Sequence, residues 1–330
     1  MSRLPVDLSQ IEAAAARIAP LIRRTPMEVD TLLSARLGQP VWHKLEVRQI
    51  TGAFKLRGAS NAVAALTPEA LARGVATVST GNHGRALAHA VRARGGRAVV
   101  CMSRLVPENK VAEIRQLGAE VRIIGASQDE AQIEVDRLVA EDGLAEVPPF
   151  DDARVVAGQG TVGLEILADL PDVALVLVPL SGGGMAAGVA AALKGRRPEV
   201  RVIGVSMARG AAMAASLAAG HPVTVVEEPS LADSLGGGIG RDNRVSLAMC
   251  RALLDDVILL SEPEIAAGMR HAYGALREVV EGAGAVGIAA LLAGRVRVSG
   301  PVVTILSGRN IDMHLHCAVI AGANGVEGLT

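Results

Sequence analysis

The sequence ALVLVPLSGGGMAAGVAAALK, residues 174–194, decides the fold of this chain. Its first residues form an apolar run without alternation, which predicts a strand over Ala174–Pro179 that is buried on both faces. Three consecutive glycines end this strand, and the Ala-rich segment that follows predicts a helix over Met185–Lys194. Residues 173–193 carry no charge and are long enough to cross a membrane, but Pro179 and the glycines divide them. The stretch therefore predicts a strand, a turn and a helix, and no membrane span.

The same alternation of short apolar runs and helical segments continues along the chain. The predicted strands are Val75–Thr80, Arg97–Ser103, Glu120–Ile124, Ala174–Pro179, Arg201–Ser206, Asp256–Ser261 and Val302–Leu306. The predicted helices are Gly84–Arg94, Glu108–Leu117, Gln128–Glu141, Met185–Lys194, Glu262–Val280 and Ala283–Ala293. Ser261 and Glu264 have the spacing of a capping box. The pattern predicts an α/β fold with an open, mostly parallel sheet, in which ligands bind at the carboxyl ends of the strands.

Composition excludes several classes of protein. A length of 330 residues indicates about two domains. The formal charge of −1 and the presence of only four aromatic residues argue against a nucleic-acid partner. Cys101, Cys250 and Cys317 lie far apart, so neither a zinc site nor a disulfide framework is expected. The N-terminal segment has the pattern of a capped helix without a signal-peptide core, and we expect a cytoplasmic location.

The glycine run predicts a phosphate site. Consecutive N–H groups over Ser181–Met185, between a strand and a helix, can bind an anion. Gly182-x-Gly184-x-x-Ala187 also loosely matches the dinucleotide fingerprint. That fingerprint requires an acidic residue at the end of the next strand, and this strand ends in Ser206. A nicotinamide oxidoreductase is therefore disfavoured.

Four further segments carry chemically useful side chains. Lys55 lies beside Phe54 in TGAFKLRGA, where desolvation would lower its pKa and make it a nucleophilic amine; alternatively it is a solvated helix residue. Residues 79–84, STGNHG, follow a predicted strand and can hold a carboxylate, or form a polar turn. Residues 281–285, EGAGA, and 307–310, SGRN, lie at the ends of other predicted elements and are compatible with a shared pocket.

Taken together and in this order, the five segments resemble the pyridoxal-phosphate enzymes of fold type II, in the group of threonine and serine dehydratases and serine racemases. The resemblance extends from Lys44 to Asn310. It implies pyridoxal 5′-phosphate as cofactor, the two-domain fold of the tryptophan synthase β type, and a homodimer. It implies a large domain of residues 1–49 and 151–330 and a small domain of residues 50–150. Residues 232–240, ADSLGGGIG, together with STGNH, are similar to the hydroxyectoine-utilisation dehydratases.

The resemblance also implies a role for each matching residue. Lys55 matches the lysine that binds the cofactor aldehyde and later moves the proton at the substrate Cα. The other cofactor-binding positions are Phe54 beside the cofactor, Asn82 at the ring 3′-oxygen, Gly182, Gly183, Gly184 and Met185 around the phosphate, and Ser307 facing the pyridine nitrogen. The substrate-binding positions are Ser79, Thr80, Gly81 and His83, which take the substrate carboxylate, and Gly236, which lines the site.

These roles predict elimination. The neutral hydroxyl of Ser307 cannot hold a proton on the pyridine nitrogen as a carboxylate would, so a long-lived carbanion is disfavoured and a β-hydroxyl leaves promptly. The expected reaction takes water from a 3-hydroxy amino acid and yields a 2-keto acid and ammonia. The alternatives are a racemase or a β-replacement synthase on the same scaffold, and a cofactor-holding protein without turnover.

Departures from the family pattern narrow these expectations. Thr80, a candidate catalytic residue, stands where the racemase has the serine that acts as acid or base on the second face of the substrate. The methyl group of threonine restricts its rotamers, which argues against racemisation. Residues 206–212 lack carboxylates, so we expect no metal there. Arg309 either binds a second acidic group of the substrate or faces solvent. The chain ends at Thr330, and we expect neither a C-terminal regulatory domain nor feedback by isoleucine.

Overall fold

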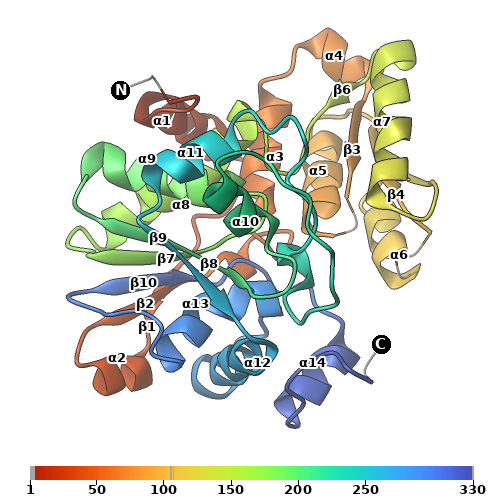
Figure 1. Ribbon diagram of the computed structural model, residues 1–330. Coiled ribbons are helices and arrows are strands. Elements are labelled where there is room, and N and C mark those ends of the chain that lie inside the picture. The colour runs from red at the N-terminus through yellow and green to blue at the C-terminus, as the bar shows by residue number, and fades with distance from the viewer. Residues whose placement is uncertain (1–3, 80, 105, 107, 329–330) are drawn as a thin grey trace.

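The computed structural model describes residues 4–79, 81–104, 106 and 108–328, which build two sheets flanked by helices (Figure 1). The larger sheet has the strand order β1 (Met27–Val29), β2 (Val41–Lys44), β10 (Val302–Ile305), β7 (Leu175–Pro179), β8 (Arg201–Met207) and β9 (Asp256–Leu260). The smaller sheet has the order β5 (Glu120–Ile123), β4 (Ala98–Met102), β3 (Val75–Val78) and β6 (Ala145–Glu146). Neighbouring strands are parallel throughout, except that β1 is antiparallel to β2. The α/β class with open parallel sheets is confirmed.

Helices bury both faces of the larger sheet, which explains why its strands are continuously apolar. Val176 and Val178 of β7 pack in the cluster that includes residues of α1 (Leu8–Ile18), α8 (Ala153–Asp169) and α9 (Gly184–Arg196). Leu175 and Leu177 point the opposite way, into the cluster with α12 (Glu262–His271) and α13 (Gly282–Leu292).

The smaller sheet is covered in the same manner. α5 (Asn82–Arg92), α6 (Glu108–Gln116) and α3 (Lys55–Ala64) contribute to one cluster, and α7 (Gln128–Asp142) packs on the opposite face. α3 also packs against α8, which covers one face of the larger sheet. The two helices approach closely at Gly158, where an added Cβ would lie 2.6 Å from the carbonyl oxygen of Arg57. Helix α3 therefore packs both against α5, which covers the smaller sheet, and against α8, which covers the larger one.

The predicted elements agree with these bounds within two residues, with one exception. The predicted helix Glu262–Val280 ends as an α-helix at His271, continues as a π-turn over Ala272–Leu276, and stops at Arg277, whose φ is +59°. At its start the capping box is confirmed, since the Ser261 N–H donates to Glu264 Oε2 at 2.8 Å. The remaining elements are α2 (Thr31–Leu37), η1 (Glu46–Arg48), α4 (Pro68–Arg73), α10 (Ala212–Ala219), η2 (Asp233–Leu235), α11 (Ser246–Leu253) and α14 (Met313–Ile320).

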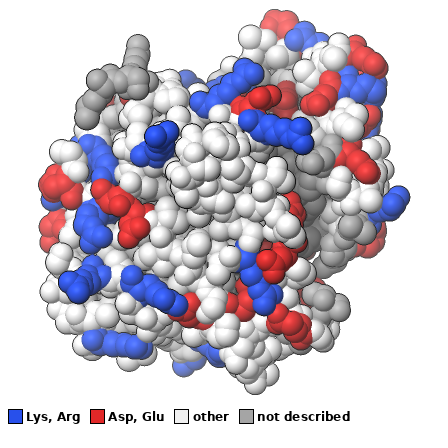
Figure 2. Space-filling view, in the orientation of Figure 1, with Lys and Arg blue, Asp and Glu red and all other residues white. Residues whose placement is uncertain are grey.

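The surface carries charges of both signs. Figure 2 shows Lys and Arg side chains interspersed with Asp and Glu around a broad uncharged centre in the area of α10 and α11. The described part of this face has no continuous basic surface of the kind that binds a nucleic-acid backbone. Within the described ranges, no helix is both long and apolar enough to cross a membrane. The same residues contain no group of three or more His, Cys, Asp or Glu side chains placed to hold a metal ion.

Candidate active site

Main-chain hydrogen bonds bring three of the sequence segments together at the carboxyl end of β10. The Phe54 N–H donates to the carbonyl of Ser307 at 3.0 Å, and the Arg309 N–H donates to the carbonyl of Gly52 at 3.0 Å. The Glu281 N–H donates to the carbonyl of Gly308 at 3.1 Å. Residues 51–55, 281–285 and 307–310 therefore lie next to one another, an arrangement compatible with a shared pocket.

Lys55 begins α3 and is half-buried at this junction. Its Nζ donates to the carbonyl of Pro149 at 2.8 Å and lies 5.4 Å from the centre of the Phe54 ring. Desolvation lowers the pKa of Lys55 to about 8, although the negative charge of Glu281 acts in the opposite direction. The alternative of a solvated helix lysine is therefore wrong, because this amine is held by the main chain in a site that disfavours its charge.

The glycine run forms the predicted cradle at the N-terminus of α9. Within the described chain, no hydrogen bond occupies the N–H groups of residues 182–185, which remain available to an anion. Gly183 has a φ of +86°, and a Cβ there would lie 2.6 Å from Met213 Cε and 2.9 Å from Cys250 Sγ. Only glycine can occupy this position without displacing its neighbours.

Phe150 packs on the other side of the cradle. A Cβ added to Gly182 would overlap the Phe150 ring, and one added to Gly184 would lie 2.9 Å from the Phe150 carbonyl oxygen. Beneath the cradle, burial raises the pKa of the Cys250 thiol to about 12, so this cysteine is not a thiolate nucleophile near neutral pH. The cradle is thus defined by packing on both sides, which leaves its N–H groups as the functional atoms.

Asn82 is the first residue of α5 and connects two of the converging loops. Its Nδ2 donates to Glu281 Oε1 at 2.8 Å, and its Oδ1 accepts from Asn310 Nδ2 at 2.6 Å. Asn310 Nδ2 also donates to the carbonyl of Thr51 at 2.9 Å. Gly308 permits this arrangement, since a Cβ there would overlap Glu281 Oε1 and approach Asn82 Nδ2 to 3.2 Å.

The loop after β3 also lies near the site, and the side chains of Ser79 and His83 make hydrogen bonds to the main chain there. Ser79 Oγ accepts from the N–H groups of Gly81 at 3.3 Å and Gly84 at 2.9 Å. His83 is buried, and its Nε2 bonds to the carbonyl of Val147 at 2.8 Å. Burial and the nearby Lys55 charge lower the pKa of His83 to about 3, so the ring is neutral and Nε2 carries the proton. Any anion in this loop therefore meets main-chain N–H groups rather than a charged imidazole. Thr80 lies outside the described residues.

The two remaining predicted positions are Ser307 and Gly236, and only Ser307 lies directly among the converging segments. Ser307 is buried at the carboxyl end of β10. Gly236 follows η2, and its N–H donates to the carbonyl of Asp233 at 3.0 Å. The segment that leads to Gly236 reaches the site at Leu231, whose carbonyl oxygen would overlap a Cβ placed on Gly282. Gly236 itself makes its described contacts within its own turn and with Met207.

Four residues of this site had no assigned role in the sequence prediction. They are Pro149, Phe150, Glu281 and Asn310. Glu281 and Asn310 belong to the segments EGAGA and SGRN, which the sequence analysis already singled out, so both residues could have been identified from the sequence. Pro149 and Phe150 follow the short strand β6, and the sequence marks them only by two consecutive prolines, Pro148 and Pro149.

A buried ion cluster anchors α3 behind the site. Arg57 is fully buried and pairs with Glu46, through Nη2 at 2.8 Å, and with Glu165, through Nη1 at 2.7 Å. Lys44 Nζ contacts Glu165 Oε2 at 2.6 Å. Since Arg57 lies two residues after Lys55 on the same helix, this cluster fixes the helix that carries the amine.

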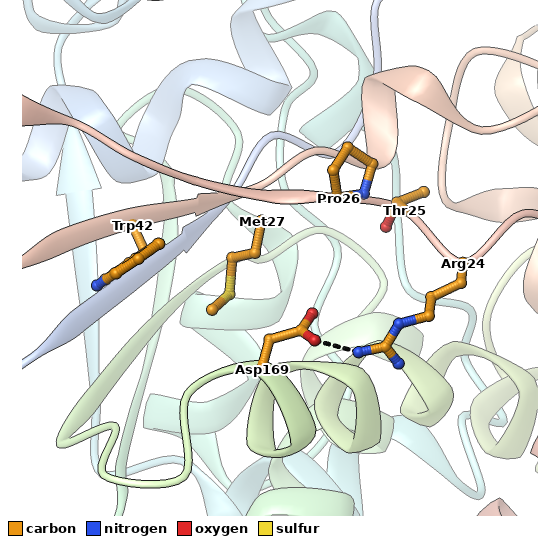
Figure 3. Close-up of a pocket in the computed structure, with 6 residues that line it drawn as sticks. All are labelled: Arg24, Thr25, Pro26, Met27, Trp42 and Asp169. Atoms are coloured by element: carbon orange, nitrogen blue, oxygen red, sulfur yellow. Dashed lines mark hydrogen bonds and ion pairs between the residues drawn. The ribbon is translucent and has the colours of Figure 1, made fainter.

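A cavity of about 380 Å³ lies elsewhere, between strands β1 and β2 and the end of α8 (Figure 3). Its lining residues are Arg24, Thr25, Pro26, Met27, Trp42 and Asp169. Arg24 and Asp169 form an ion pair at its edge. None of the predicted site residues lines this cavity.

Comparison with known proteins agrees with this geometry. Residues 18–308 match the family model described as "Pyridoxal-phosphate dependent enzyme". A putative threonine dehydratase of Sinorhizobium fredii is 61% identical over 96% of both chains. An L-threonine ammonia-lyase of Thermotoga maritima is 38% identical over 94% of this chain and 77% of its own length. The structure of maize serine racemase superposes with a TM-score of 0.90 at 34% identity, covering 96% of this chain and 97% of the racemase. The chain is thus a pyridoxal-phosphate-dependent enzyme of the fold type II family, in the group of threonine and serine dehydratases and serine racemases, and it is an ammonia-lyase (dehydratase).

Proposed function

We propose that this enzyme removes water from a 3-hydroxy amino acid of the threonine or serine type and releases a 2-keto acid and ammonia. The names of the relatives from Sinorhizobium fredii and Thermotoga maritima support threonine as the first substrate to test. Serine, 3-hydroxyaspartate and a hydroxyectoine-derived compound are further candidates. The observation that carries the proposal is the half-buried Lys55 amine, which donates to the carbonyl of Pro149, next to the Phe150 that packs against the glycine cradle. The neighbouring Phe54 N–H donates to the carbonyl of Ser307, whose hydroxyl is neutral.

The residues present fit pyridoxal 5′-phosphate. The N–H groups of residues 182–185 suit its phosphate, and their packing leaves no room for side chains in the cradle. The lowered pKa of Lys55 suits the amine that binds its aldehyde. Phe54 would lie beside the ring, Asn82 would donate to the 3′-oxygen, and Ser307 would face the pyridine nitrogen.

When bound, the cofactor supplies an electron sink for the charge that develops at the substrate Cα. Lys55 moves the Cα proton: with a pKa of about 8, a useful fraction of the free amine is neutral near neutral pH and can take up that proton at Nζ. The Ser79–His83 loop binds the substrate carboxylate through main-chain N–H groups at the start of α5.

Ser307 favours elimination over reactions that need a persistent carbanion. A hydroxyl has no negative charge with which to hold a proton on the pyridine nitrogen, so negative charge at Cα is relieved by loss of the β-hydroxyl. The alternative activity is a racemase or a β-replacement synthase, and the similarity to maize serine racemase gives the racemase its support. Racemisation needs a second acid or base on the other face of the substrate, and Thr80 is the residue in question.

The proposed organisation has a large domain of residues 1–49 and 151–330 and a small domain of residues 50–150. All strands of the smaller sheet fall between residues 75 and 146, which supports that division. A homodimer in the cytoplasm is also proposed, on the family resemblance.

Substrate assays test the proposal directly. Purified enzyme with pyridoxal phosphate is incubated with each candidate, and ammonia and 2-keto acid are measured together with the chirality of the remaining amino acid. Equimolar ammonia and keto acid from one candidate is the expected result. Inverted substrate without ammonia would identify a racemase, and capture of an added thiol would identify a synthase. Absence of all three products would refute turnover of these substrates.

A further inference from the structure

The orientation of the Asn82 carboxamide is determined by its neighbours on both sides. A carboxylate accepts hydrogen bonds and does not donate them, so the atom of Asn82 that faces Glu281 Oε1 must be Nδ2. The carbonyl of Thr51 likewise only accepts, so the atom of Asn310 facing it must be Nδ2. That nitrogen then donates to Asn82 Oδ1 at 2.6 Å. Asn310 Nδ2 therefore donates to both the Thr51 carbonyl and Asn82 Oδ1, and Asn82 Nδ2 in turn donates to Glu281.

We infer that Asn310 is a positioning residue, which presents the Asn82 amide nitrogen to the cofactor. Glu281 uses one of the two N–H groups on Asn82 Nδ2, and the other has no acceptor among the described residues. This inference rests on the proposed assignment of Asn82 as the amide that donates to the cofactor ring oxygen. Asn310 does not touch the cofactor in this account; it acts by occupying Asn82 Oδ1 and so keeping the nitrogen on the opposite side.

Replacing Asn310 by aspartate makes a nearly isosteric change that reverses this polarity. The new carboxylate would face two acceptors, the Thr51 carbonyl and Asn82 Oδ1, where the native amide donates to both. If Asn82 turned over to donate to Asp at this position, its oxygen would face Glu281 instead. Either arrangement places two acceptors against each other, which costs stability and removes the single orientation of the amide.

A second substitution separates stability from orientation. In Glu281→Gln alone, the new amide oxygen can still accept from Asn82 Nδ2, so the native direction is kept. In the double variant Asn310→Asp/Glu281→Gln, the new Gln donates to Asn82 Oδ1 and Asn82 donates to the new Asp. Every hydrogen bond of Asn82 is then satisfied with its amide inverted, and only the Thr51 carbonyl still faces an acceptor, as it does in Asn310→Asp alone.

The test compares the four proteins by thermal unfolding without cofactor and by titration with pyridoxal phosphate, followed by visible absorption. We expect Asn310→Asp to unfold at a lower temperature and to bind the cofactor about tenfold more weakly, the effect of one lost hydrogen bond. We expect the double variant to regain part of the unfolding temperature that Asn310→Asp loses, because only the contact with the Thr51 carbonyl stays unsatisfied. Its cofactor affinity should stay about tenfold lower and its absorption band should stay altered.

Recovery of both properties in the double variant would show that Asn310 is merely structural, and wild-type affinity in Asn310→Asp would refute the inference outright. Should Asn310→Asp fail to fold, Asn310→Ala removes the donor without adding a competing acceptor; a several-fold loss of affinity supports the inference, and unchanged affinity overturns it. Because the readout is cofactor binding, a failure to turn over any hydroxy amino acid would refute the proposed substrate class without touching this result.

Discussion

Substitution of Arg57 by methionine should destabilise the enzyme strongly, because it leaves buried carboxylates without their cation. Arg57 and Glu46 are 0% exposed and Glu165 is 14% exposed. The guanidinium donates to both oxygens of each carboxylate, at 2.7–2.9 Å. Glu165 would keep Lys44 as a partner, whereas the side-chain donor left to Glu46 among the described residues would be the Thr25 hydroxyl, at 2.5 Å.

Removing one partner of a buried ion pair costs about 3–5 kcal/mol. Chains of this length unfold with an entropy of ~0.7 kcal/mol/K, from ~2.1 cal/mol/K per residue, so the melting temperature should fall by about 4–7 °C. The assay is urea unfolding of the holoenzyme followed by circular dichroism, with thermal unfolding as a second measure. Arg97→Met is the matched control, since Arg97 pairs with Glu120 at 50% and 39% exposure and should change the free energy of unfolding by about 0–1 kcal/mol.

Equal costs for Arg57→Met and Arg97→Met would refute the reasoning, because the buried cluster would then contribute no more than a surface pair. The cluster also predicts a rescue. Neutralising both carboxylates in Arg57→Met/Glu46→Gln/Glu165→Gln removes the uncompensated charges and should recover part of the lost stability.

Three further predictions concern titration and packing. Desolvation lowers the pKa of Lys55 to about 8. The rate at which cofactor-free enzyme takes up pyridoxal phosphate, measured by stopped-flow absorbance, should therefore rise with pH around a midpoint near 8. A midpoint near the ordinary lysine value of ~10.4 would contradict the burial of this amine. Burial alone would raise the pKa of Asp30, but hydrogen bonds, first from His43 and then from the Leu33 N–H, hold it well below its ordinary value. The stabilisation from Asp30 is therefore present above pH ~4 and is lost as the pH falls below that value. In denaturant titrations, the difference in unfolding free energy between wild type and Asp30→Asn should shrink between about pH 6 and about pH 3. A difference that stays constant over this range would contradict the lowered pKa of Asp30. A Cβ on Gly184 would lie 2.9 Å from a backbone oxygen, so Gly184→Ala should weaken pyridoxal phosphate binding at least about tenfold. Gly274→Ala is the control and should bind the cofactor normally, because a Cβ on Gly274 would have no atom within 4 Å. Equal binding by both variants would mean that the cradle tolerates side chains.

The sequence predicted the strands well because most of them are buried on both faces. Leu175–Pro179 and Ala98–Met102 are apolar at nearly every position, and helices cover both sides of each. Short edge strands were missed, since Met27–Val29 has too few residues to show a period. Helix α8 was missed because its glycines conceal the helical pattern, and Gly158 is there to admit α3.

The individual parts of the site were predictable, and their connections were not. Lys55 and the cradle at Gly183 carry local signals, a lysine beside an aromatic residue and a glycine run between a strand and a helix. The bonds that orient Asn82 join it to Glu281 and Asn310, which lie 199 and 228 residues away in the sequence. No local pattern reports such a pairing, because the folding of both sheets creates it.

The proposed function requires that Lys55 binds pyridoxal phosphate in the site formed at the carboxyl end of β10. The most direct measurement reduces the cofactor-loaded enzyme with borohydride and maps the modified peptide by mass spectrometry, beside the visible spectrum of Lys55→Ala. We expect a yellow protein whose single pyridoxyl adduct lies on Lys55, and a Lys55→Ala variant that lacks the adduct. An adduct on another lysine, or a Lys55→Ala variant with an unchanged band, would contradict it.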